Sequence, residues 1–482
     1  MDKAWLQNYD SRVPESLSYP VLPLDHFLLH AAHKFPKRTA TIYSAPANGR
    51  LAAARLTYAQ LNKAVNHFAA GLQQTGVKKG DHVTIALPNS PQFIIAAYAT
   101  WRIGGIVVCI SPTIKPDTLS YILTDSGSET LIISRGLYET AQAVRSKTSL
   151  QRVIISRASD FLPWTAVFST SLSGNQPHVR RLKGASGSST LSFKHLLREK
   201  TARLKLIEVT PPDTAVILYP QHGRYSSARS QPGVTLTHRN LVCSATMLNH
   251  WLPLASGQET TLAAIPFYDA YGLTAVLNAG IAHAATLVLI PNPREIAHSL
   301  SALAQFHVTF VPGVPRLFDA LLQQNEQDKR NLSSIKIALS SKTALPSALR
   351  KRFQAATNGR LFNAYGLSET GGLVAMDPWH TIRPTAVGLP LPDTDVQITD
   401  TSFGTDALDT GEIGEVVVRG PQVMAGYWQQ SKTTAEVLHT GPDGRAGWLF
   451  TGDLGYLDTD GFLHITTPRQ DPIARGKLRG QR

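Results

Sequence analysis

Short runs of β-branched residues alternate with segments of helical periodicity along most of this 482-residue chain. Between Leu56 and Pro112, the residues Leu61, Val65, Phe68, Ala69 and Leu72 fall on one helical face, which predicts a helix. The strand-like runs are "HVTIAL", "TAVILY", "TLAAIPF", "ATLVLI", "VTFVPG" and "IKIALS". Such alternation predicts parallel sheets covered by helices, and therefore an α/β fold.

The pattern changes after Pro390. The segments "DVQIT", "GEIGEVVVRG" and "GFLHIT" are short strand-like runs separated by glycine turns, with little helical periodicity. We therefore expect a β-rich unit near the end of the chain. No internal repeat is present.

Composition limits the classes of partner and compartment. The 47 Lys and Arg residues exceed the 34 Asp and Glu residues, for a formal charge of +13, which favours anionic partners. The positive charges are scattered and match no nucleic-acid-binding motif, so we expect no nucleic acid partner. The two cysteines are expected to be buried free thiols, and the polar N-terminus lacks a signal peptide, which favours the cytoplasm. The apolar run 93–110 is interrupted by Arg102, Gly104 and Gly105 and predicts a helix, a turn and a strand.

The segment 160–192 differs from the rest of the chain. It begins aromatic, passes through a basic cluster and ends in Gly and Ser. One interpretation is a mobile surface loop. The other is a membrane-surface patch, and hence a peripheral location at the membrane. In that case the interfacial residues would be Phe161, Trp164, Phe168, Arg180, Arg181 and Lys183.

Two carboxylates occupy glycine-bounded loops. Glu369 lies between Ser368 and Thr370 in "NAYGLSETGG". A carboxylate flanked by two hydroxyls on a glycine-bounded loop could coordinate a magnesium ion and a phosphate, although an ordinary polar turn is an alternative. Asp453 follows Gly452 at a turn that leaves a strand-like run, where a carboxylate is suited to bind a ribose diol. Together the two loops predict a nucleotide site.

An ordered series of segments resembles the adenylate-forming superfamily and, within it, the bacterial long-chain fatty-acid CoA ligases. It covers nearly the whole chain, and the order is far more specific than any one segment. The segments are "AWLQNY", "LTYAQLN", "GVKKGDHVTIALPNSPQF", "GGIVVCISP", "LTHRNLV", "IPFYDAYGLTAVLN", "VTFVPGVPRLFDALL", "AYGLSET", "VGLPLPDTD", "GEIGEVVVRGPQVMAGYW" and "TGDLGYLDTDGFLHI".

The resemblance implies an α/β fold in which a large AMP-binding (adenylation) domain spans 1–465. Its α/β subdomains would cover about 1–210 and 211–385 and its β-rich, distorted-barrel subdomain 386–465. It implies ATP-dependent conversion of a long-chain fatty acid to an acyl-adenylate and then to acyl-CoA. The cofactors would be ATP and Mg²⁺, and CoA would be a co-substrate. An adenylating ligase for aryl or other acids and a non-catalytic acyl- or nucleotide-binding module stay open as alternatives.

The resemblance also implies roles for individual residues. Glu369 and Thr370 would be catalytic, with Glu369 holding magnesium. The nucleotide would contact Tyr365, Gly366, Thr370, Asp453 and Arg469. The acyl channel would be lined by Phe267, Tyr268, Tyr271, Gly272, Val311 and Gly313.

Departures from the family pattern lead us to expect weak or absent activity. The glycine-rich phosphate loop of the family is replaced by "YPQHGRYSSARSQPGV", which offers Arg224 and Arg229 in place of a lysine. Lys342 stands in "LSSKTALP", where the family has small residues, and Asp269 stands where it has a histidine. Residues 466–482 represent only the family's hinge, so we expect the mobile C-terminal domain to be absent from this chain.

Overall fold

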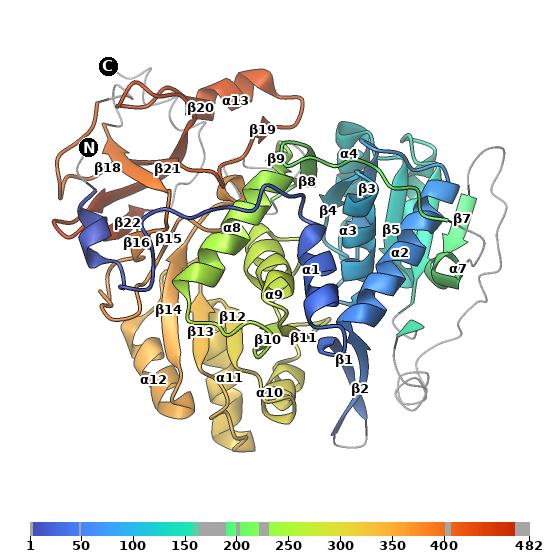
Figure 1. Ribbon diagram of the computed structural model, residues 1–482, viewed down its shortest axis with the longest axis horizontal. Helices are drawn as coiled ribbons and strands as arrows, with labels where there is room; N and C mark the ends of the chain where they lie inside the picture. The colour runs from blue at the N-terminus through green and yellow to red at the C-terminus, as the bar shows by residue number, and fades with distance from the viewer. Residues whose placement is uncertain are drawn as a thin grey trace.

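The structure is a computed structural model that describes residues 3–47, 50–157, 160–161, 189–198, 203–220, 231–400 and 406–467. Two large sheets and one smaller antiparallel sheet make up its strand framework (Figure 1). No described helix combines the length and the apolar character needed to cross a membrane. Of the segment 160–192, the structure describes only 160–161 and 189–192, and Phe161 is partly buried against the main apolar core. The other residues of the predicted membrane-surface patch lie outside the described residues, so that interpretation stays a prediction.

The first large sheet has nine strands in the order β16-β15-β14-β13-β12-β10-β11-β1-β2. Its centre is parallel, whereas β2, β15 and β16 pair antiparallel at the two edges. The strands are β1 (Thr39–Ala47), β2 (Arg50–Thr57), β10 (Thr260–Ala263), β11 (Thr286–Leu289), β12 (Phe310–Gly313), β13 (Ile337–Ser340), β14 (Arg360–Tyr365), β15 (Ala375–Met376) and β16 (Leu389–Pro390).

The second large sheet has eight strands in the order β19-β9-β8-β4-β3-β5-β6-β7. All pairs from β8 to β7 are parallel, and β9 and β19 are antiparallel additions at one edge. The strands are β3 (His82–Ala86), β4 (Ile106–Cys109), β5 (Thr130–Ser134), β6 (Arg152–Ser156), β7 (Ser189–Ser192), β8 (Thr214–Leu218), β9 (Val234–Thr237) and β19 (Gly426–Tyr427).

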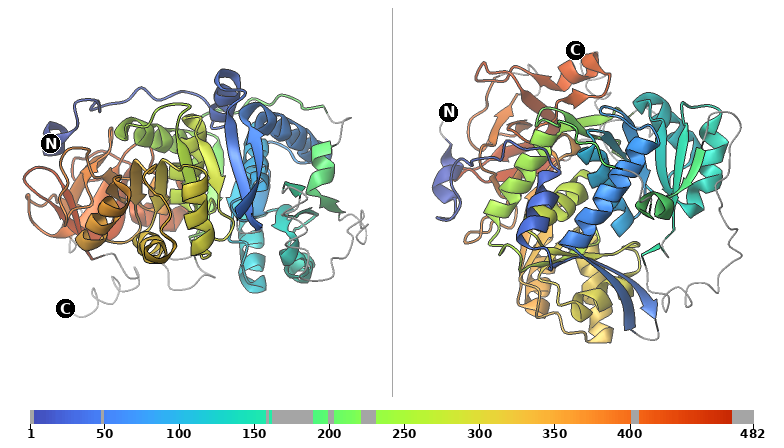
Figure 2. Two further views of the ribbon diagram at one scale, coloured as in Figure 1. Left: turned by 90° about the horizontal axis from the view of Figure 1, so that it is seen from below. Right: turned by 45° about the vertical axis from the view of Figure 1, so that its right-hand side comes forward.

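A small antiparallel sheet follows β16, as the change of pattern after Pro390 predicts. It contains β17 (Asp395–Thr399), β18 (Gly414–Arg419), β20 (Leu438–His439), β21 (Trp448–Leu457) and β22 (Leu463–Thr467). Figure 2 shows this sheet in orange and red at one end of the molecule, opposite β5 and α7. The N-terminal segment lies beside it, because Asn8 donates a hydrogen bond of 2.9 Å to the carbonyl of Asp460. The predicted mixed α/β fold class with a curled β-rich unit is confirmed.

Helices cover both faces of the two large sheets, as expected for parallel strands buried on each side. One apolar core under α10, α11 and α12 covers one face of the nine-stranded sheet, and another under α4 and α5 covers a face of the eight-stranded sheet. The helices are α1 (His26–Lys34), α2 (Tyr58–Gln74), α3 (Pro91–Arg102), α4 (Pro116–Ser126), α5 (Tyr138–Arg145), α7 (Phe193–Arg198), α8 (His238–Trp251), α9 (Ala279–Ala282), α10 (Ile296–Gln305), α11 (Pro315–Asp328), α12 (Ser347–Thr357) and α13 (Ser431–Val437).

Local sequence explains where several helices begin. Thr57 and Gln60 form a reciprocal capping box at the start of α2, and Thr237 and Asn240 form one at the start of α8. The five apolar residues predicted to share one face of α2 are all fully buried. The apolar run 93–110 forms most of α3, a turn and β4, and both cysteines are buried free thiols, so these expectations are confirmed.

His238, the first residue of α8, is a fully buried titratable group at the junction of α8 with the N-terminal segment. Its Nδ1 accepts a hydrogen bond of 3.2 Å from the backbone N–H of Leu24. Protonation of Nδ1 would remove this acceptor and bury a charge. Burial accordingly lowers the pKa of His238 to about 4, against a smaller opposing effect of Asp213.

Stability is expected to fall at acidic pH because of His238. The unfolded state binds the proton near the ordinary histidine pKa, whereas the folded state binds it only near pH 4. The contribution of neutral His238 to the free energy of unfolding is therefore complete above about pH 6.5. It is lost as the pH falls to about 4, which lowers the free energy of unfolding by about 3 kcal/mol. His238→Asn keeps an acceptor near Nδ1 and does not titrate, so urea unfolding of this variant should show a weaker decline between pH 7.5 and pH 4.5. Burial also raises the pKa of Asp377 to about 6, and this carboxyl group changes stability with pH in the opposite direction. Both proteins contain Asp377, so the difference between them isolates the contribution of His238. Equal declines in both proteins would contradict the assignment.

Candidate active site

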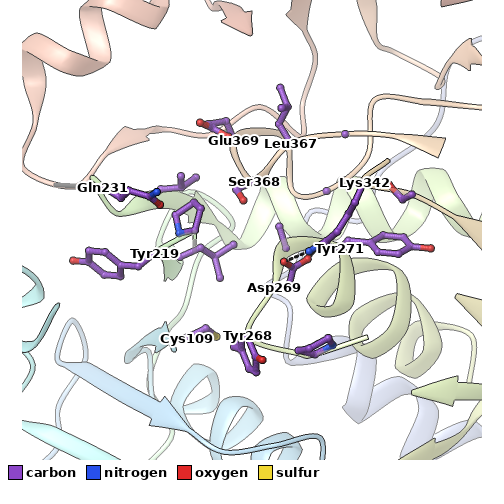
Figure 3. A pocket seen from close by; sticks show the side chains of 18 of the residues that line it. Cys109, Tyr219, Gln231, Tyr268, Asp269, Tyr271, Lys342, Leu367, Ser368 and Glu369 are labelled. Carbon is purple, nitrogen blue, oxygen red and sulfur yellow. Dashed lines mark hydrogen bonds and ion pairs between the residues drawn. The ribbon is translucent and has the colours of Figure 1, made fainter. Parts of the chain in front are cut away.

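A cavity of about 600 Å³ opens where the carboxyl ends of parallel strands from both large sheets meet (Figure 3). Its wall includes Cys109 at the end of β4, Leu218 at the end of β8, Ser341 after β13 and Gly366 after β14. Ligands of open α/β folds bind at this side of a parallel sheet, because the loops that leave the strands carry the functional side chains. The antiparallel sheet contributes Thr451 and Asp453 to the same wall.

Glu369 lies on a short 3-10 helix, Ser368–Thr370, directly after β14. Its side chain lines the cavity and is largely buried, and its Oε1 accepts a hydrogen bond of 2.8 Å from the hydroxyl of Tyr427 in β19. The carbonyl of Glu369 accepts a hydrogen bond from the backbone N–H of Met424. The segment around β19 therefore fixes both the backbone and the carboxylate of Glu369.

Asp453 is directed into the cavity by an irregularity in β21. The register between β18 and β21 shifts, and Gly452 adopts a φ of 80°, a conformation that glycine adopts without strain. The N–H of Gly452 donates to Glu415 Oε1 at 2.9 Å, and the N–H of Asp453 donates to Thr451 Oγ1 at 3.1 Å. The hydroxyl of Tyr365 donates to Asp453 Oδ2 at 2.5 Å, which joins the end of β14 to the bulge.

Close backbone contacts explain the glycines of the loop after β14. A Cβ at Gly366 would lie 2.3 Å from the carbonyl oxygen of Gly372, so the loop folds back on itself there. Gly372 has a φ of 94° and its Cα lies against the backbone of Tyr271, where a Cβ would be 2.8 Å from the Tyr271 Cα. The loop that carries Glu369 therefore packs directly on the start of the π-helix Gly272–Asn278.

The residues proposed for the nucleotide are placed in different ways. Gly366, Glu369 and Asp453 line the cavity. Thr370 is fully buried, and its hydroxyl is hydrogen-bonded within its own turn to Leu367. Tyr365 is not part of the described cavity wall, and its hydroxyl donates a hydrogen bond to Asp453, which is. Arg469 lies outside the described residues, as do Arg224 and Arg229 of the altered phosphate loop.

The residues proposed for the acyl channel also divide into two groups. Tyr268 and Tyr271 line the cavity. Burial raises the pKa of Tyr271, so its hydroxyl stays protonated and donates a hydrogen bond of 2.7 Å to the carbonyl of Leu339. The other four pack among neighbouring core groups and are not part of the described cavity wall, namely Phe267, Gly272, Val311 and Gly313.

Tyr427 is a site residue that sequence reasoning does not reveal. It lines the cavity and donates to Glu369, which lies 58 positions earlier in the chain. It belongs to the segment "GEIGEVVVRGPQVMAGYW", which supports the resemblance, but no local spacing relates it to Glu369. Only the antiparallel pairing of β19 with β9 brings it to this place.

Two of the departures from the family pattern, Lys342 and Asp269, meet in space. Lys342 Nζ forms an ion pair with Asp269 Oδ2, and both side chains line the cavity (Figure 3). The other oxygen of Asp269, Oδ1, accepts a hydrogen bond of 3.1 Å from the N–H of Tyr271. A lysine that replaces a small residue and an aspartate that replaces a histidine are therefore direct partners.

Comparison with known families tests the resemblance found in the sequence. The model of the AMP-binding enzyme family matches residues 28–428. The chain belongs to this family. Among curated relatives, it is 33% identical over 479 residues to a long-chain-fatty-acid–CoA ligase of Bacillus subtilis, covering 98% of this chain and 81% of that protein. It is 32% identical over 482 residues to a protein of the same name from Salmonella typhimurium, covering 98% and 82% of the two chains.

A solved structure agrees with these relatives. The structure of a long-chain-fatty-acid–CoA ligase from Archaeoglobus fulgidus has a TM-score of 0.79 and 25% sequence identity, covering 98% of this chain and 89% of that one. The chain is thus an AMP-binding, adenylate-forming enzyme of the acid–thiol ligase family, for which ATP and CoA are co-substrates. The resemblance found in the ordered sequence segments is confirmed.

Proposed function

We propose that this AMP-binding enzyme activates long-chain fatty acids, first to the acyl-adenylate and then to acyl-CoA, with activity that is weakened in this chain by its departures from the family pattern. The observation that carries the proposal is a single cavity that joins two largely buried carboxylates, Glu369 and Asp453, to the aromatic side chains of Tyr268 and Tyr271. The names of the two bacterial relatives support a long-chain acid as the substrate. Charged groups for a nucleotide and apolar surface for an acyl chain therefore share one space.

The proposed chemistry uses ATP to convert a poor acyl donor into a good one. A carboxylate oxygen of the acid attacks the α-phosphorus of ATP, forming a new P–O bond while the bond to pyrophosphate breaks. The sulfur of CoA then attacks the acyl carbon, AMP leaves with the electrons of the C–O bond, and the thiol proton is released. Both steps exploit leaving groups that are stable as anions, which oxide is not.

Two carboxylates would bind the nucleotide in this scheme. Asp453 would accept hydrogen bonds from the ribose hydroxyls, and the hydroxyl of Tyr365, at the end of β14, donates to its Oδ2. Glu369 lies on the adjacent loop, oriented by Tyr427, where it would hold magnesium together with phosphate oxygens. Magnesium would offset negative charge on the phosphates during the transfer. Among the described residues, no group of three or more His, Cys, Asp or Glu side chains could hold a metal ion. A magnesium ion that is bound mainly by phosphates and water needs only one or two carboxylates, so Glu369 is compatible with this role.

Further roles belong to the same proposal. Gly366 would allow the nucleotide to approach the backbone, and Thr370, Tyr365 and Arg469 would contact the phosphates or the adenine. The acyl chain would enter past Tyr268 and Tyr271. The division of 1–465 at about residues 210 and 385, and the membrane contact of 160–192, stay predictions of the sequence.

Exchange of labelled pyrophosphate into ATP tests the proposal, because it reports adenylation without CoA. Exchange that depends on palmitate supports the proposed acid. Exchange that depends instead on an aryl acid would favour the second candidate, an adenylating ligase for other carboxylic acids. ATP binding without exchange for any acid would indicate a non-catalytic binding module.

A further inference from the structure

The cavity carries an uneven distribution of charge. Among the described residues of its wall, three are carboxylates, Asp269, Glu369 and Asp453, and Lys342 is the single Lys or Arg. The substrates of the proposed reaction, a carboxylate and a nucleotide, are both anions. A positive charge on the cavity wall favours the entry of such an anion, because it offsets part of the repulsion from the three carboxylates.

Lys342 has an unusual backbone conformation for a residue with a side chain. It follows β13 with a φ of 75°, in the left-handed region that favours glycine. Residues held in this region cluster at binding sites, where the surrounding structure compensates the local strain. The conformation places the Lys342 side chain toward Asp269 inside the cavity (Figure 3).

Stability does not explain the Lys342–Asp269 ion pair. The two side chains retain 43% and 27% of their exposure, and partly exposed ion pairs contribute little to folding. An ammonium group has three N–H donors, so Lys342 can keep its contact with Asp269 and still donate to a ligand. Asp269 is itself oriented by the N–H of Tyr271.

We propose that Lys342 is an anion-binding residue of this cavity, donating to a negatively charged oxygen of the substrate, and that Asp269 positions it and competes with that oxygen. The oxygen belongs either to the carboxylate of the acid or to the phosphate of the nucleotide. This assignment of the anion rests on the proposed function. Lys342 and Asp269, which both depart from the family pattern, would then act together in binding the anion.

Binding of matched ligand pairs to the full chain tests the proposal. Decanoate and 1-decanol share one chain and differ in the carboxylate, and AMP and adenosine differ in the phosphate. Lys342→Ala should weaken binding of the anionic member of at least one pair by roughly 10- to 100-fold, the value of a lost hydrogen bond to a charged group, and leave the neutral member unchanged. Lys342→Arg should retain most of the preference for the anion.

Asp269→Asn gives a second test with the opposite sign. Removing the competing carboxylate should strengthen binding of the same anionic ligand, whereas a purely structural ion pair would be disrupted by either substitution with no preference for anions. Lys79→Ala is the matched control, because Lys79 pairs with Asp213 at a similar exposure of 42% but does not line the cavity. Thermal unfolding of each variant verifies that it is folded.

The outcomes separate this inference from the proposed function. Loss of the preference within only one ligand pair identifies the carboxylate or the phosphate as the partner of Lys342. Wild-type protein that prefers decanoate and AMP over their neutral partners, with both preferences unchanged in Lys342→Ala, overturns the inference and leaves the proposed function standing. Wild-type protein that binds neither anion overturns the proposed function, and the inference with it.

Discussion

Asp453→Ala is expected to weaken ATP binding more than about a hundred-fold. The carboxylate would accept hydrogen bonds from two ribose hydroxyls, and hydrogen bonds to a charged group contribute roughly 1.5 to 3 kcal/mol each. The hydroxyl of Tyr365 donates to Oδ2, and a carboxylate has about four acceptor positions in all. Isothermal titration with ATP measures the change directly.

Tyr365→Phe is the matched control for Asp453→Ala. It removes the hydroxyl that donates to Asp453 and leaves the carboxylate in place, supported by the Asp453 N–H bond to Thr451. Its effect on ATP affinity should therefore be clearly smaller than that of Asp453→Ala. If Tyr365→Phe weakens binding as much as Asp453→Ala does, or if adenosine binding is unaffected by both, Asp453 does not contact the ribose.

Glu369→Gln is expected to remove most of the gain in ATP affinity that magnesium provides. The amide keeps the size of the side chain and can still accept the hydrogen bond from Tyr427, but it lacks the anionic oxygen that a hard cation requires. Binding measured without magnesium should change little. Titrations with and without Mg²⁺ separate the two effects.

Tyr427→Phe provides the comparison for Glu369→Gln. It removes the group that orients the carboxylate and keeps the negative charge, so magnesium-dependent binding should fall by roughly 10- to 100-fold, as for other residues that support a metal ligand, and less than in Glu369→Gln. A Glu369→Gln variant with the full magnesium dependence of the wild type would exclude Glu369 as the metal ligand.

The sequence predicts the α/β framework well because the relevant signals are local. The apolar face of α2 and the run that forms α3 and β4 are set by residues a few positions apart. The same applies to the change into antiparallel strands after Pro390, where glycine turns separate short β-branched runs. The type of each of these elements can therefore be predicted from residues that lie close together in the sequence.

Part of the candidate site is predictable for a related reason. Glu369 and Asp453 lie on loops that leave strands, and such loops converge at one edge of parallel sheets. By contrast, Val311 is buried within β12, and Gly313 at the end of β12 lies against the ring of Phe318, so neither residue is part of the described cavity wall.

The contacts that refine the site could not be predicted from local sequence. Tyr365 and Asp453 are 88 positions apart, and Lys342 and Asp269 are 73 positions apart. Each pair depends on how loops from different strands and sheets are placed together. A residue that departs from the family pattern therefore looks like an isolated defect in the sequence and acquires a partner only in three dimensions.

Titration of ATP into wild-type protein, Asp453→Ala and Glu369→Gln, each with and without Mg²⁺, tests the central claim that the cavity at the ends of the two parallel sheets is the nucleotide site. We expect the wild type to bind ATP more tightly with magnesium, Asp453→Ala to bind weakly in both conditions, and Glu369→Gln to lose mainly the effect of magnesium. Equal, metal-independent affinity of all three folded proteins for ATP would contradict the claim and reduce the glycine loop around Glu369 to an ordinary turn.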